Sequence, residues 1–108
     1  MEHAKELREL VDLVVKEGAS DLHLAEGRIP MIRVSGELLP LIKRPVTTTE
    51  AMKGMLKVLI NEENQALLQQ NRDVDFSYSV EGVARFRGNA FYRMGAISVA
   101  LRLIPQHI

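Results

Sequence analysis

The chain has 108 residues, with 14 basic and 14 acidic side chains and a formal net charge of zero. A hydrophobic content of 46% and a charged content of 26% are ordinary for a soluble globular protein of one domain. No apolar run approaches the roughly 18 residues of a membrane span, and the absence of cysteine excludes a disulfide framework and a thiolate metal site. These features are typical of a cytoplasmic protein.

The first quarter of the chain predicts a helix and then a strand. Apolar residues at helical spacing indicate an amphipathic helix that ends at Gly18; they are Leu7, Leu10, Val11 and Val14. Residues 20–24 then alternate, so that Asp21 and His23 share one face of a strand and the two leucines share the other.

A hairpin and two helices are expected next. Ile32 and Val34 begin the hairpin, and Ser35 and Gly36 form its turn. Pro40 makes a central place in a sheet unlikely for the returning strand. Residues 47–50 have the spacing of a capping box at the start of a helix, with Thr47 as the cap. Asn61 is expected to interrupt that helix and to cap a shorter one.

The last three strands place arginines on one face. From residue 83 to residue 92, Arg85, Arg87 and Asn89 point away from the apolar side chains. If Met94 and Gly95 form a tight turn, antiparallel pairing sets Arg87 beside Arg102.

The charge distribution suggests a use for these arginines. Residues 82–108 contain four arginines and no acid. Like charges that face each other across a sheet are destabilising, and the planar guanidinium suits phosphate oxygens. The cluster therefore suggests an anion site. The alternative is that these arginines are simply solvated surface groups or partners of acids on neighbouring strands.

The order of elements predicts the fold class. One helix, three strands, two helices and three strands with short connections favour an α+β domain with a mostly antiparallel sheet of about six strands. The helices are expected to cover one face and to leave the arginine face open.

Motifs for complete catalytic sites are absent from the sequence. It contains no phosphate-binding G-x-x-x-x-G-K-[ST] loop and no nucleophile elbow. His3, His23 and His107 are scattered, so no spacing indicates a metal site. Asp21 and His23 could form an acid–base or ligand pair, although such pairs more often satisfy hydrogen bonds locally. We expect no catalytic residue and no ATP hydrolysis from the isolated chain.

Five segments resemble, in order, motifs of the type IV pilus and type II secretion ATPases. The family motifs are ASDLHL at residues 19–24, PMIRVDG at 30–36, DFSY at 75–78, GVARFRVNAF at 82–91 and FRTIP at 101–105. Ser35 stands where aspartate is usual, and Gly88 replaces a β-branched residue. A glycine inside a strand often marks a bulge, which would upset the pairing of Arg87 with Arg102.

The resemblance implies the N-terminal, PAS-like domain of a hexameric motor, over residues 1–104, with an interdomain linker beginning at residues 105–108. A RecA-like domain, absent from this chain, would follow and would bind ATP and Mg²⁺. The implied partners are that domain, neighbouring subunits and the pilus platform protein at the cytoplasmic side of the inner membrane. Retraction motors for twitching motility match best; extension motors and type II secretion ATPases are the alternatives.

The resemblance also implies roles for residues. Arg85, Arg87 and Arg102 would sense the nucleotide phosphates. Asn89, Arg33, Asp21 and His23 are further candidates for supporting these arginines; the family signature includes Asp21 and His23 but assigns them no role.

Two other classes of function remain open. One is a nucleic-acid-binding module, against which the low aromatic content counts, and the other is a sensory PAS-type domain with a small ligand in its core.

Overall fold

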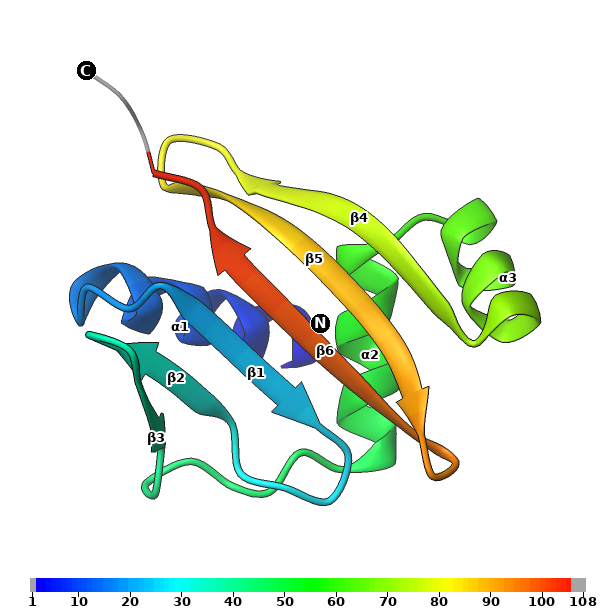
Figure 1. Ribbon diagram of the computed structural model, residues 1–108, viewed down its shortest axis with the longest axis horizontal. Helices are drawn as coiled ribbons and strands as arrows, with labels where there is room; N and C mark the ends of the chain where they lie inside the picture. The colour runs from blue at the N-terminus through cyan, green and yellow to red at the C-terminus, as the bar shows by residue number, and fades with distance from the viewer. Residues whose placement is uncertain (1, 106–108) are drawn as a thin grey trace.

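The structure is a computed structural model that describes residues 2–105, and in that range it contains three helices and six strands (Figure 1). The elements are α1 (Glu2–Lys16), β1 (Asp21–Ala25), β2 (Met31–Val34), β3 (Glu37–Pro40), α2 (Thr49–Leu59), α3 (Glu62–Asn71), β4 (Asp73–Val80), β5 (Ala84–Arg93) and β6 (Ala96–Leu103). The strands form one antiparallel sheet in the order β3-β2-β1-β6-β5-β4. The predicted α+β class is confirmed, and the strand with Pro40 lies at an edge.

The helices cover one face of the sheet and leave the other open. In Figure 1, α1 and α2 lie behind the sheet, whereas α3 lies beside β4. The core fills the space between α1, α2 and the sheet, and its largest fully buried side chains are Phe86, Leu7, Leu10, Leu22, Leu24, Met52, Met55, Leu68 and Leu101. No helix in the described range is long and apolar enough to cross a membrane.

The ends of the helices follow local chemistry. Gly18, with φ of +67°, ends α1 as predicted, and the amide of Ala19 donates to the carbonyl of Val14 in the pattern of a Schellman motif. Asn61 caps α3 through a 2.8 Å bond from the amide of Asn64.

The predicted cap of α2 is wrong by one residue. Thr48 is the N-cap, and its hydroxyl accepts from the amide of Ala51 at 3.0 Å. Thr47 is buried in the preceding loop, where its amide donates to the carbonyl of Arg28 and its carbonyl accepts from the amide of Gly27. These loop contacts decide which threonine begins the helix.

Both predicted two-residue hairpin turns are present. Ser35 and Gly36 have φ of +52° and +81°, and Met94 and Gly95 have φ of +52° and +83°. Two successive positive φ values are typical of the type I′ turns that suit the twist of a hairpin. The second turn fixes β5 against β6, and Arg87 lies directly opposite Arg102 as expected.

Gly88 does not form a bulge. Its pairing continues without interruption to Phe76 on one side and to Leu101 on the other. A Cβ atom at this position would lie 2.3 Å from Cζ of Phe76, so the ring occupies the space that a side chain would need. The glycine thus accommodates an aromatic ring from β4.

Candidate functional site

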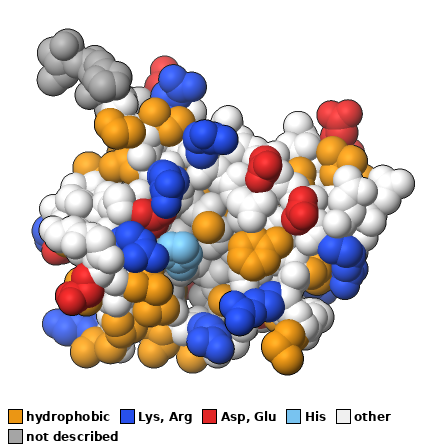
Figure 2. Space-filling model, in the orientation of Figure 1, with side chains coloured by type: hydrophobic (Ala, Val, Ile, Leu, Met, Phe, Trp, Pro, Cys, Tyr) orange, Lys and Arg blue, Asp and Glu red, His pale blue; other side chains and the backbone are white. Residues whose placement is uncertain are grey.

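A row of polar side chains crosses the open face of the sheet. The pairing of neighbouring strands aligns Arg33 on β2, Asp21 on β1, Arg102 on β6, Arg87 on β5 and Ser77 on β4. Figure 2 shows basic side chains across this face, with a histidine among them. The antiparallel register therefore gathers residues from five strands that are far apart in sequence.

Asp21 and Arg102 form the central ion pair of the row. Nε of Arg102 donates to Oδ2 of Asp21 at 3.1 Å, and the hydroxyl of Ser20 donates to the other carboxylate oxygen. Burial raises the pKa of Asp21, but the hydrogen bonds from Ser20 and Arg102 outweigh burial and leave this pKa below its ordinary value of 3.8. Asp21 is therefore an anion at neutral pH.

This ion pair corrects one expectation from the sequence. The arginines of residues 82–108 have no acid in their own segment, but β1 brings one beside Arg102. The alternation of residues 20–24 predicted that Asp21 lies on one face of its strand. It could not predict that this strand pairs with β6, which brings Asp21 to Arg102.

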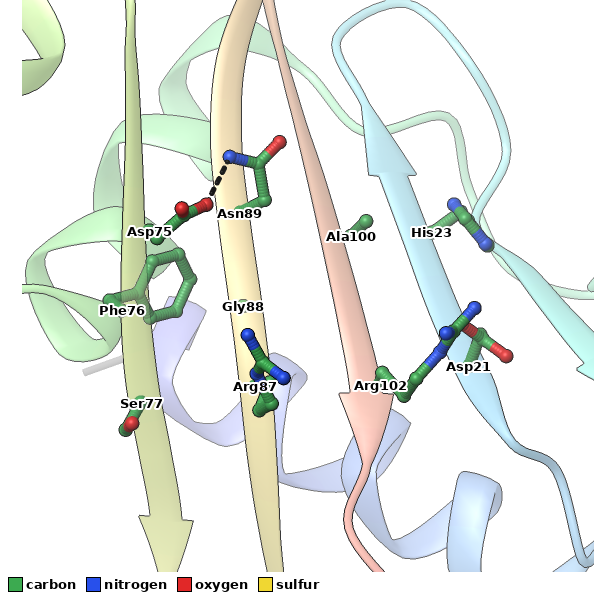
Figure 3. A pocket seen from close by; sticks show the side chains of 10 residues that line it. All are labelled: Asp21, His23, Asp75, Phe76, Ser77, Arg87, Gly88, Asn89, Ala100 and Arg102. Carbon is green, nitrogen blue, oxygen red and sulfur yellow. Dashed lines mark hydrogen bonds and ion pairs between the residues drawn. The ribbon is translucent and has the colours of Figure 1, made fainter.

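Arg85 and Arg87 lie on the same face of β5 and are exposed. Within residues 2–105 neither forms an ion pair. Arg33 donates to the carbonyl of Gly36 at 3.0 Å, at the turn of its own hairpin. Asn89 instead donates to Oδ1 of Asp75 at 2.8 Å, the bond marked in Figure 3.

His23 lies next to this row and is partly buried. Its Nε2 is enclosed and has no hydrogen-bond partner in the described part of the chain. Burial lowers the pKa of the imidazole below its ordinary 6.5, Asp21 opposes this shift, and Arg33 and Arg102 add to it. His23 is therefore neutral at pH 7.

These side chains surround an open hollow of about 580 Å³ (Figure 3). Its lining residues are Asp21, His23, Asp75, Phe76, Ser77, Arg87, Gly88, Asn89, Ala100 and Arg102. Five of the seven predicted site residues lie here; Arg85 and Arg33 lie outside the lining. No group of three or more metal-ligating side chains occurs within residues 2–105. Two exposed guanidinium groups beside an open hollow can bind an anion with several oxygens.

Comparison with known proteins places this domain among pilus ATPases. No protein-family model matches the chain. Two relatives from Pseudomonas aeruginosa, the type IV pilus ATPase PilU and the pilus retraction ATPase PilT, are 32% and 35% identical to it over 103 residues. These alignments cover 95% of this chain but only 27% and 30% of the relatives, so the chain spans less than a third of their length.

Solved structures support the same relationship. The crystal structure of the pilus retraction motor PilT with bound ADP matches with a TM-score of 0.83 and 37% identity, over 93% of this chain and 29% of that one. The ATPase DotB of Legionella pneumophila matches in fold, with a TM-score of 0.77 over 93% of this chain and 28% of that one, at 23% identity. The chain therefore belongs to the type IV pilus and type II secretion ATPase family and corresponds to the N-terminal domain of its PilT-like members.

Proposed function

We propose that this chain is the nucleotide-sensing N-terminal domain of an ATP-driven motor for pilus retraction. The proposal rests on the relatives named as pilus and retraction ATPases and on the PilT structure that holds ADP. Residues 1–104 would form the PAS-like domain and residues 105–108 would begin the linker; residues 106–108 lie outside the described range. A RecA-like domain would bind the nucleotide, and the subunits would assemble into a hexamer that acts on the pilus platform at the cytoplasmic side of the membrane.

In this role, Arg85 and Arg87 would bind the phosphates of ATP held by the RecA-like domain. The observation that carries this step is that both arginines are exposed on the open face and form no ion pair within residues 2–105, so their donors are available. Arg102 faces Arg87 across the β5–β6 pair and would contact the same phosphates. Charge-assisted bonds to ATP would draw the two domains together, and loss of the terminal phosphate would weaken them.

The residues of the hollow fit the phosphate groups of ATP better than they fit its metal ion. Guanidinium groups match phosphate oxygens, whereas the carboxylates of Asp21 and Asp75 are already hydrogen-bonded to Arg102 and Asn89. Mg²⁺ would accordingly be held mainly by the nucleotide and the RecA-like domain.

The test is the ATP turnover of the longer protein that this proposal requires. Arg85→Ala and Arg87→Ala should each lower kcat, by up to about a thousandfold if the arginine acts as an arginine finger does. Their stability should stay within about 0.5 kcal/mol of the wild type, because neither side chain is part of the core.

Lys57→Ala is the matched control, since it removes one exposed positive charge from α2, on the covered side of the sheet (Figure 1). It should leave kcat unchanged. Wild-type turnover in both arginine variants would contradict the proposal, as would an equal loss of turnover in Lys57→Ala.

A further inference from the structure

The polar row contains one carboxylate among its arginines. Asp21 lies between Arg33 and Arg102 on its two neighbouring strands, and Arg102 in turn faces Arg87. The side chain of Asp21 is only 7% exposed, whereas that of Arg102 is 73% exposed. The buried carboxylate of Asp21 thus accepts a hydrogen bond from Nε of Arg102, whereas most of the Arg102 side chain remains exposed to solvent.

The ion pair leaves the phosphate-binding edge of Arg102 available. The bond to Asp21 uses Nε, and within residues 2–105 the two terminal nitrogens of the guanidinium donate no hydrogen bond. In Figure 3 the Arg102 side chain extends from β6 toward Asp21 on β1.

Hydrogen bonds of Ser20 hold Asp21 in place for its contact with Arg102. The amide of Ser20 donates to the carbonyl of Arg33, and the carbonyl of Ser20 accepts from the amide of Leu103, both at 2.8 Å. The hydroxyl of Ser20 holds the second oxygen of Asp21. The start of β1 is therefore fixed to both neighbouring strands, and the carboxylate has little freedom to turn away.

We infer that Asp21 is a positioning residue that orients Arg102 for phosphate, an inference that rests on the proposed function of the arginine face. Asp21 fixes Nε from β1, on the side of β6 opposite to Arg87, so the Arg102 side chain is held in one orientation, and its two terminal nitrogens donate no hydrogen bond within residues 2–105. The ligand is the phosphate chain of a nucleoside di- or triphosphate.

This role predicts an effect opposite in sign to simple charge repulsion. A carboxylate beside an anion site weakens anion binding by Coulomb repulsion, so its removal alone would strengthen binding. If Asp21 positions Arg102, Asp21→Asn should instead weaken binding, because the amide group that faces Arg102 no longer offers an anionic acceptor to Nε.

The experiment titrates the 108-residue chain with inorganic tripolyphosphate and follows the Nε–H resonance of Arg102 by NMR. The wild type should show a slowly exchanging Nε–H signal that is lost in Asp21→Asn. Affinity for tripolyphosphate should fall about tenfold in Asp21→Asn, by analogy with the lower end of the losses seen when the hydrogen-bonded partners of metal ligands are removed. Arg102→Lys, which keeps the charge but lacks the fork, should show a similar loss.

Asp75→Asn is the matched control, because it removes an acid from the same hollow that does not contact Arg102. It should strengthen binding, by at most about threefold at physiological salt. Unchanged or tighter binding of tripolyphosphate by Asp21→Asn would overturn the inference, since Asp21 would then only compete with phosphate for Arg102.

Ser20→Ala provides a second variant if Asp21→Asn does not fold. It removes the hydroxyl that holds the carboxylate of Asp21 but keeps the charge, so it should also weaken the binding of tripolyphosphate. Unchanged binding in Ser20→Ala would overturn the inference.

The two proposals fail in different ways. If the wild-type chain does not bind tripolyphosphate, or if Arg87→Ala binds it equally well, the phosphate-sensing function fails. The Nε–H signal of Arg102 then reports separately whether Asp21 fixes the guanidinium: its persistence in Asp21→Asn refutes the positioning role outright, and its loss shows a fixed Arg102 that does not serve phosphate.

Discussion

Replacement of Gly88 by alanine should strain the β4–β5 pair. The new Cβ would lie 2.3, 2.4 and 2.9 Å from three atoms of the Phe76 ring, and all three distances are shorter than a real contact allows. The ring is the end of a rotatable side chain on an edge strand, so it can move, but it then loses packing against the core. Overpacking of this kind costs about 1–3 kcal/mol, whereas relief of the glycine entropy returns about 0.5–1 kcal/mol.

The assay is a double-mutant cycle on the purified chain, with free energies of unfolding from urea titration. Gly88→Ala should destabilise the wild type by about 1–2 kcal/mol, and each kcal/mol corresponds to about 4–8 °C in Tm for a domain of this size. In a Phe76→Ala background the same change should be neutral or stabilising by up to about 1 kcal/mol. Equal effects of Gly88→Ala in the two backgrounds would show that the ring does not occupy the space above the glycine and would refute the reasoning.

Two further outcomes follow from burial. Phe86→Ala should lower the free energy of unfolding by about 3–5 kcal/mol, because this ring is fully buried and stacks on Tyr78 at a centroid distance of 6.3 Å. Arg85→Ala, at the adjacent but exposed residue, should change the free energy of unfolding by less than about 0.5 kcal/mol, and similar losses in both variants would contradict the assignment of faces. His23 should make the free energy of unfolding depend on pH. Burial lowers the pKa of His23 in the folded state, the charge of Asp21 opposes this shift, and the charges of Arg33 and Arg102 add to it. The unfolded chain therefore takes up the proton at a higher pH than the folded chain does, and stability falls as pH drops through about 6.5. The loss between pH 7.5 and pH 5.5 should be smaller in His23→Gln, and an identical pH profile in urea titrations of both proteins would refute that role.

Local patterns predicted much of the fold and one part of the site. The alternation of residues 83–92 and 97–103, together with the turn at Met94 and Gly95, was sufficient to place Arg87 opposite Arg102. Such hairpins are set by neighbouring residues, since turn type and side-chain alternation fix the register. The same reasoning predicted the turn at Ser35 and Gly36.

Contacts between distant segments could not be predicted in this way. The pairing of β1 with β6 joins Asp21 to a residue 81 positions later, and no local pattern specifies which strand lies beside β1. The same limit applies to Gly88, whose role depends on a ring from β4, and to Thr47, which is drawn into contacts with residues 27 and 28. In each case a long-range contact overrode the local signal.

The spacing of the arginines is set by the neighbouring row of residues, which is apolar. This row belongs to the core side of the sheet and consists of Ile32, Leu22, Leu101, Gly88 and Phe76. Because side chains alternate along a strand, a slip of one residue in any pair would bury the arginines and expose this row. The free energy that exposure of the apolar row would cost therefore keeps Arg87 and Arg102 opposite each other despite the repulsion between their charges. The core thus fixes the position of Arg102 in the sheet, and Asp21 sets only the orientation of its side chain.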